Sequence, residues 1–274
     1  MSAAVRRALV LVALALPAGP LAAQRTLRVC ADPNNLPFSS RRLDGFENRI
    51  AVVVARELGA RVAYVWWPQR RGFLRSTLDA GRCDVVIGTS AELDAVLATR
   101  PYYRSTYVFV TRADARPVRS FGDSSLRARR IGVHFTGAGG NPPPAEALAR
   151  HGLAENLVGF SIYGDYREPH PPARLIDAVT SGEVDVAVAW GPLAGYFAQP
   201  GRARTALRLV PVPATDESPG LPMTFAIAMG VRRGDTALRD ELQRALDRRA
   251  PEIRAILERF GVPLVDDPPR GATR

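Results

Sequence analysis

The residues best suited to binding a small molecule follow the ends of apolar runs that have the character of strands. Carboxylate, amide and hydroxyl groups fix polar ligands in pockets that are otherwise apolar. In open α/β sheets, ligands bind outside the carboxyl ends of the strands, so residues at those ends are candidates for a binding cleft. They are Asp32, Asn34, Asn35, Thr89, Ser90, His134, Thr136 and Gly137. A structural turn role stays open for the two asparagines.

A second group of candidates is aromatic and cationic. Trp66, Trp67, Gln69, Arg70 and Arg71 lie within one short segment. Successive strand residues point to opposite faces, so one of the two tryptophans is expected to face the cleft. A ring beside a guanidinium could take an anionic or aromatic ligand, or an acidic loop of a partner. The alternative is one ring packed in the core and two arginines on a solvated face.

Catalytic chemistry has little support. His134, His151 and His170 show no metal-ligand spacing, and neither a G-x-S-x-G nor an H-E-x-x-H motif occurs. His134 is the acid–base candidate because it ends a strand that faces the cleft, and a structural role is the alternative. Gly137–Gly140 precedes a helix and could hold an anion, but it matches no phosphate-binding motif. We therefore expect a binding protein without metal or cofactor, and not an enzyme.

A motif that occurs twice positions these candidates. TLDAGRCDVVIGTS and VTSGEVDVAVAWGP each end a helix and then place Gly, two residues and Asp before an apolar strand, so Gly81 and Asp84 repeat as Gly182 and Asp185. Glycine after a periodic segment is a helix C-cap, because it adopts the left-handed conformation without strain. The unbroken apolar run after each Asp is typical of a strand covered on both faces. The repeat predicts two similar α/β units.

The order of the predicted elements gives two lobes. The βαβαβ opening implies a parallel sheet with helices on both faces. We predict an α/β protein of two lobes with mixed, mostly parallel sheets, joined by two hinge crossings near residues 105–114 and 220–228. Lobe 1 is predicted to comprise residues 24–110 and 224–274, and lobe 2 residues 111–223. Helices are expected over residues 70–80, 235–249 and 252–260.

The first 23 residues have the character of a cleavable signal peptide, with Arg6 and Arg7 before a short apolar run and small residues up to Ala23. We therefore predict a periplasmic protein. The two arginines contribute 2 of the formal net charge of +10, which leaves +8 for the mature chain and favours an acidic partner. All 37 basic residues are arginine. We expect no nucleic-acid partner and no membrane insertion.

Two cysteines, Cys30 and Cys83, leave two interpretations open. In an oxidising compartment a pair favours a disulfide. However, if Asp32 lies level with Gly88 on neighbouring parallel strands, the cysteines are offset by three residues, or roughly 10 Å, which is beyond disulfide reach. The alternative is two buried thiols that pack as small apolar groups.

Several segments resemble the periplasmic solute-binding proteins of the type II class, in particular their amino-acid-binding branch. They are LRVCADPNNLPFS, GFENRIAVVVARELGA, GRCDVVIG, TRPYYRSTYVFV and GEVDVAVAW. With YVWWPQRRGFLRSTL and RPYYRSTYVFV, the chain resembles the MxaJ/XoxJ family. The resemblance implies the type II periplasmic-binding-protein fold. It also implies action beside a quinoprotein (PQQ) methanol dehydrogenase and its c-type cytochrome. Of the two branches of the family, we favour the lanthanide-dependent one.

The resemblance also shows where this chain departs from an amino-acid receptor. In the family pattern an Arg follows the third strand end and an Asp ends the second-lobe strand, together clamping the ligand's carboxylate and ammonium. Here Ala95 and Trp190 hold those positions. Tyr103 and Trp190 complete the predicted cleft. We expect the chain to act by protein contact. The alternatives are a receptor of an ABC transporter for a small solute that is not an amino acid, and an enzyme on the same fold.

Overall fold

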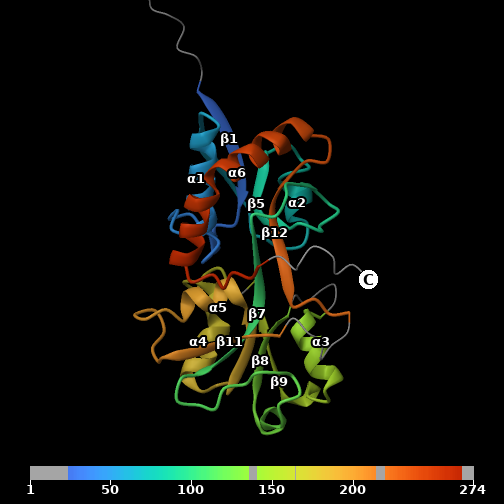
Figure 1. Ribbon diagram of the computed structural model, residues 1–274, viewed down its shortest axis with the longest axis vertical. Helices are drawn as coiled ribbons and strands as arrows, with labels where there is room; N and C mark the ends of the chain where they lie inside the picture. The colour runs from blue at the N-terminus through green and yellow to red at the C-terminus, as the bar shows by residue number, and fades with distance from the viewer. Residues whose placement is uncertain (1–23, 136–140, 164, 214–219, 267–274) are drawn as a thin grey trace, which may run out of the picture.

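The computed structural model describes residues 24–135, 141–163, 165–213 and 220–266 (Figure 1). The predicted signal peptide, Thr136 and Gly137 lie outside these ranges. The molecule is elongated, and its helices and strands gather into two groups along the long axis. This is the predicted two-lobe α/β architecture.

One ten-stranded mixed sheet runs through both lobes in the order β4-β1-β5-β12-β7-β10-β8-β9, with β6 beside β12 and β11 beside β7. The strands are β1 (Arg25–Ala31), β4 (Ala60–Trp66), β5 (Val85–Ser90), β6 (Leu97–Ala98), β7 (Tyr103–Arg112), β8 (Ile131–Phe135), β9 (Leu157–Ser161), β10 (Val186–Trp190), β11 (Leu207–Pro211) and β12 (Thr224–Val231). A separate hairpin pairs β2 (Asn34–Asn35) with β3 (Ser39–Ser40).

Two strands connect the lobes. The first half of β7 pairs antiparallel with β12, and its second half pairs antiparallel with β10 and β11. The outer pairs of each lobe, β1 with β4 and β5, and β8 with β9 and β10, are parallel. The change of partner along β7 supports the proposal that one crossing falls near residues 105–114.

Helices cover the sheet of each lobe. They are α1 (Phe46–Glu57), α2 (Phe73–Ser76), α3 (Pro143–Arg150), α4 (Arg174–Ser181), α5 (Gly191–Phe197) and α6 (Thr236–Arg259). Helix α1 packs beside α6 in the upper lobe of Figure 1. Its core-facing residues Phe46, Ile50 and Val54 are fully buried, as the helical spacing of apolar residues predicts.

Three helix predictions were wrong in extent. Residues 235–249 and 252–260 form one helix, α6, with Pro251 inside it. Proline removes one helical hydrogen bond, but burial of Leu246 and Ile253 on either side offsets that loss. Conversely, the helix expected over residues 70–80 is reduced to α2, because Gly72 begins it in a left-handed conformation and turns follow after Thr77.

The repeated Gly-x-x-Asp motif builds the same polar cluster in both lobes. In the first, Arg28 donates to the Asp84 carboxylate through its backbone and its guanidinium, and to the Gly81 carbonyl at 2.9 Å. In the second, Arg130 makes the matching bonds to Asp185 and to the Gly182 carbonyl at 2.7 Å. Both glycines have positive φ, as predicted. Each cluster thus fixes a turn to the strand that precedes it in its lobe.

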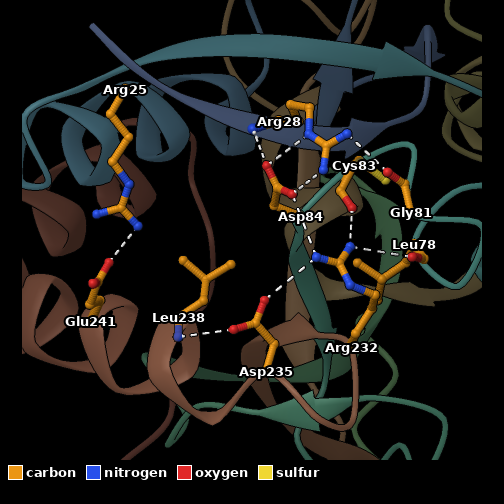
Figure 2. A network of polar contacts seen from close by, with 10 residues as sticks. All are labelled: Arg25, Arg28, Leu78, Gly81, Cys83, Asp84, Arg232, Asp235, Leu238 and Glu241. Atoms are coloured by element: carbon orange, nitrogen blue, oxygen red, sulfur yellow. Dashed lines mark hydrogen bonds and ion pairs between the residues drawn. The ribbon is translucent and has the colours of Figure 1, made fainter. Parts of the chain in front are cut away.

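The first-lobe cluster is larger than its repeat (Figure 2). Arg232, which follows β12, donates to the Cys83 carbonyl at 2.6 Å and lies 3.6 Å from the Asp84 carboxylate. It also pairs at 3.5 Å with Asp235, whose carboxylate accepts from the Leu238 backbone N–H at the start of α6. Asp84 therefore connects β1, the turn before β5 and the entry to α6.

We expect Asp84→Asn to lower the free energy of unfolding by about 2 kcal/mol, because hydrogen bonds to charged groups stabilise by this order. The Asp84 side chain is 17% exposed and lies near two guanidinium groups. Burial alone would raise the pKa of Asp84, but Arg28 and Arg232 hold it below the usual range. Urea unfolding at pH 7 measures the effect. Asp185→Asn is the matched control, and a loss there as large as at Asp84 would contradict the argument.

The cysteines are disulfide-bonded, with Cα atoms 5.5 Å apart. The predicted register was right, since Cys30 lies level with Val86 and therefore Asp32 with Gly88. The predicted separation of roughly 10 Å was wrong. It assumed that Cys83 extends strand β5, whereas β5 begins at Val85 and the chain bends at Asp84. That bend carries Cys83 back towards Cys30.

Candidate functional site

A cavity of about 530 Å³ lies between the two lobes. Residues from the ends of β1, β5, β8 and β10 line it, as expected for ligand sites of open α/β sheets, together with residues from the first halves of β7 and β12. The lining residues are Asp32, Asn34, Asn35, Phe38, Glu47, Gln69, Gly88, Thr89, Ser90, Tyr103, Tyr107, His134, Ile162, Tyr163, Tyr166, Pro172, Trp190, Leu193, Phe225 and Ile227.

Three aromatic side chains from β7, β10 and β12 form one wall of the cavity. The ring centroids of Tyr107 and Trp190 are 5.4 Å apart, and that of Phe225 lies 5.8 Å from Trp190 and 6.3 Å from Tyr107, all edge-to-face. Burial raises the pKa of Tyr107 to about 12. The wall is therefore uncharged at neutral pH and offers ring faces and edges to a ligand.

Asp32 is a buried residue directly after β1 that accepts hydrogen bonds from three donors. Its side chain is almost fully buried, and its carboxylate accepts from the backbone N–H groups of Asn34 at 2.8 Å and Gln69 at 2.6 Å. The hydroxyl of Tyr166, from the second lobe, also donates to it. None of these three donors is a cation, so the Asp32 charge is solvated by neutral groups.

Contacts around Tyr166 join the two lobes over the cavity. The Arg70 guanidinium lies 4.8 Å from the centroid of the Tyr166 ring. Nearby, the Asn34 side-chain amide donates to the Glu168 carbonyl at 3.1 Å. Burial and the Asp32 carboxylate raise the pKa of Tyr166 above its usual value, so its hydroxyl remains a donor at neutral pH. The structure thus has its lobes in contact.

We expect Tyr166→Phe to loosen this contact, because it leaves the Asp32 carboxylate without one of its three donors. A hydrogen bond to a charged group contributes about 1.5 to 3 kcal/mol, so its loss should shift the free-energy difference between joined and separated lobes by this amount towards separation. Small-angle X-ray scattering should then show a larger radius of gyration than for the unchanged protein. Tyr163→Phe removes a hydroxyl for which the structure gives no such contact, and it should leave the radius unchanged. Equal radii for all three proteins would contradict the role of Tyr166.

Glu47 is the lining residue with the most perturbed carboxyl group. It lies in the first turn of α1 and faces the end of β5, where a Cβ at Gly88 would collide with its carboxylate. Within the part of the chain that the structure describes, no hydrogen bond or ion pair reaches that carboxylate. Burial, and secondarily the Asp32 charge, raise the pKa of Glu47 to about 8. The acid is therefore largely protonated at pH 7.

Sequence reasoning missed Glu47. The only signal was an acid directly after Phe46, on the first turn of a helix with a fully apolar face. That pattern is also typical of a helix-stabilising surface acid, because the helix dipole favours a carboxylate there. Five lining residues of the second lobe were missed as well, because they lie in loops, in a short 3-10 helix or in α5 and not at predicted strand ends: Ile162, Tyr163, Tyr166, Pro172 and Leu193.

His134 lines the cavity at the end of β8 and is 8% exposed. Burial lowers its pKa to about 4. The imidazole is neutral at pH 7 and offers one N–H donor and one nitrogen acceptor to a ligand.

Nine predicted site residues line the cavity: Asp32, Asn34, Asn35, Gln69, Thr89, Ser90, Tyr103, His134 and Trp190. Trp66, Trp67, Arg70 and Arg71 are not among the lining residues. Trp66 stacks on Tyr64 at 4.6 Å, and Trp67 is exposed beside Arg82. A role for this segment in partner contact remains a prediction.

The amino-acid clamp has no counterpart in the described cavity wall. Ala95 is exposed and does not line the cavity, and Trp190 lies where the family pattern has its Asp. Arg100 pairs with Asp247 on α6 at 2.7 Å, away from the cleft. None of the described lining residues is cationic, and the described residues contain no cluster of His, Cys, Asp and Glu able to hold a metal ion.

The fold and the interlobe cavity define a two-lobe solute-binding protein. Residues 27–262 match the model of the bacterial extracellular solute-binding proteins, family 3, and the chain belongs to this family. Among the described residues, no helix is long and apolar enough to span a membrane.

More specific similarities point to one group within the family. The chain is 38% identical over 253 residues to Protein MoxJ of Methylorubrum extorquens (88% of this chain, 82% of that one). It is 32% identical to Protein MoxJ of Paracoccus denitrificans (92% and 94%). Among solved structures it is similar to MxaJ from Methlophaga aminisulfidivorans MPT (TM-score 0.75, 26% identity, 87% and 100% covered) and to XoxJ from Methylobacterium extorquens AM1 (0.72, 34%, 88% and 100%). The resemblance to the MxaJ/XoxJ family is confirmed.

Proposed function

We propose that this protein is a periplasmic accessory protein of a PQQ-dependent methanol dehydrogenase and acts by protein contact, without catalysing a reaction itself. The observation that carries the proposal is the similarity to MoxJ over most of both chains, combined with a cleft in which no described lining residue is the arginine of an amino-acid clamp. The lanthanide-dependent enzyme is the proposed partner, and its c-type cytochrome is a second candidate. The predicted signal peptide supports the periplasmic location.

The net charge supports an electrostatic component to this association. The mature chain carries a formal charge of +8, which accelerates encounter with an acidic surface and makes binding sensitive to salt. We therefore expect the mature protein to bind the dehydrogenase in surface plasmon resonance or to change its rate of methanol oxidation. We further expect the association to weaken as NaCl rises from 20 to 300 mM. Neither binding nor a rate change with both the lanthanide- and the calcium-dependent enzyme would contradict the proposal.

A second candidate function is that of a solute receptor for an ABC transporter. The interlobe cavity favours it, since a receptor of this design closes its lobes around a ligand. A solute present at 100 times its Kd would stabilise the protein by about 2.7 kcal/mol, which a thermal-shift screen detects. A cognate permease would support this alternative. Full activity of the dehydrogenase in the absence of the protein would support it too.

A further inference from the structure

The interlobe cavity combines acidic groups with aromatic rings. Asp32 and Glu47 contribute two carboxyl groups, while the described lining residues include no arginine, and the chain contains no lysine. This is unexpected for a protein with 37 arginines. An anionic ligand would meet two acids and no cation among the described lining residues, because Arg70 lies against the Tyr166 ring and is not one of them. Burial of an unpaired charge costs several kcal/mol. The charge pattern excludes an anion as the preferred occupant.

The two carboxyl groups differ in the number of hydrogen bonds that they already accept. Asp32 already accepts from three donors and holds the lobes together. Glu47 has no hydrogen bond or ion pair among the described residues, and it is partly exposed and lines the cavity. Because a buried carboxyl without a partner is unfavourable, Glu47 is the group in this site whose interactions a ligand would complete.

Aromatic side chains line the same cavity as Glu47. Strands β7, β10 and β12 contribute Tyr103, Tyr107, Trp190 and Phe225 to the cavity wall. The second lobe also contributes Tyr163 and Tyr166. A cation over the faces of such rings gains about 0.5 to 2 kcal/mol, and quaternary ammonium groups are recognised by aromatic cages of this kind. A volume of about 530 Å³ lies within the usual range for small-ligand sites.

We propose that the cavity binds a small organic cation, a substituted ammonium seated against the Glu47 carboxylate and among the aromatic side chains. The Glu47 carboxylate pairs with the ammonium, and the rings contact its methyl or methylene groups. The site does not depend on the proposed dehydrogenase partnership, because all its groups belong to this chain.

Binding of such a cation is linked to proton release. Glu47 has a pKa of about 8, so at pH 7 it loses its proton when an ammonium group binds beside it. The other titratable groups that interact with it are Asp32, Tyr64, Tyr102 and Tyr103. Burial raises the pKa of each of these tyrosines, which therefore stay neutral. The affinity for the cation is expected to rise between pH 6.5 and 8.5.

Isothermal titration calorimetry of the mature protein with choline and its neutral isostere 3,3-dimethylbutan-1-ol tests the proposal. At pH 8.5 we expect choline to bind at least 10-fold more tightly than the isostere. Glu47→Gln should weaken choline at least 10-fold and change the isostere less than 3-fold. Tyr163→Leu should weaken choline and leave the fold intact by circular dichroism. Glu146→Gln, an exposed acid on α3, is the matched control and should have no effect.

Three results would overturn the proposal. One is the absence of saturable binding by choline, methylammonium and tetramethylammonium up to 10 mM. The second is equal affinity for choline and its isostere. The third is unchanged choline affinity in folded Glu47→Gln protein. The cation proposal can fail while the proposed association with the dehydrogenase stands. Equally, the association can fail while cation binding stands, so the two proposals are tested separately.

Discussion

Replacing both Cys30 and Cys83 by alanine is expected to lower the free energy of unfolding by about 4 kcal/mol. The disulfide joins residues separated by 53 positions, and closing a loop of that length restricts the unfolded chain by about this amount. Both cysteines are almost fully buried beside Phe73 and Leu78, so the sulfur atoms also fill core volume. The bond attaches the turn before β5 to β1 and thereby supports the strand ends that carry Asp32 and Ser90.

Urea unfolding followed by circular dichroism measures this effect. The unchanged protein should lose a similar amount of stability in a reducing agent, whereas the double variant should not respond to the reductant. That second comparison is the control, because it separates the cross-link from any general action of the reagent. A difference between oxidised and reduced protein below about 1 kcal/mol would contradict the expected role.

The second large effect is a pH-dependent stabilisation by Glu47→Gln. Glu47 has a pKa of about 8 in the folded protein and near 4.5 when exposed, so between these values the unfolded chain ionises first. The carboxyl group therefore has no effect below pH 4.5 and destabilises the fold increasingly as the pH rises to 8. The difference between these two pKa values corresponds to roughly 5 kcal/mol above pH 8. Because Glu47 is partly exposed and water reaches the cavity, the expected effect is about 2 to 4 kcal/mol.

Unfolding free energies from pH 4 to pH 9.5 test this expectation. Glu47→Gln should match the unchanged protein at pH 4 and exceed it at pH 9. Glu146→Gln supplies the control, since Glu146 is 44% exposed in an ion pair with Arg150 and should give a nearly constant difference of less than about 0.5 kcal/mol. Parallel pH curves for the unchanged protein and Glu47→Gln would show that Glu47 ionises normally.

The disulfide lies outside the cavity, whereas Glu47 lines it. The disulfide fixes strand ends that were recognisable from sequence, while Glu47 introduces a charge that the fold disfavours until a partner arrives. Strained or unfavourable groups are concentrated at functional sites, because a binding site keeps open interactions that a core would satisfy. The stability given up at Glu47 is consistent with a ligand that completes the site.

Five strands, the repeated turn motif and nine of the cavity-lining residues were recognisable from the amino-acid sequence. Apolar runs located β1, β5, β8, β10 and β12 because strands covered on both faces need continuous apolar residues. Gly81 and Gly182 marked the turns because their left-handed conformation favours glycine. Residues at strand ends, such as Asp32 and Ser90, were predictable because sheet topology places those ends at the cleft.

Only the tertiary structure decided the disulfide, the acid in the cavity and the contact between the lobes. The Cys30–Cys83 bond depends on a bend at Asp84 that strand periodicity does not encode. The raised pKa of Glu47 and the hydrogen bond from Tyr166 to Asp32 depend on groups brought together from distant parts of the chain. Local patterns specify which residues form an element and which face it buries. Charge burial and pairing between elements arise only when the elements pack, so they could not be read from the sequence.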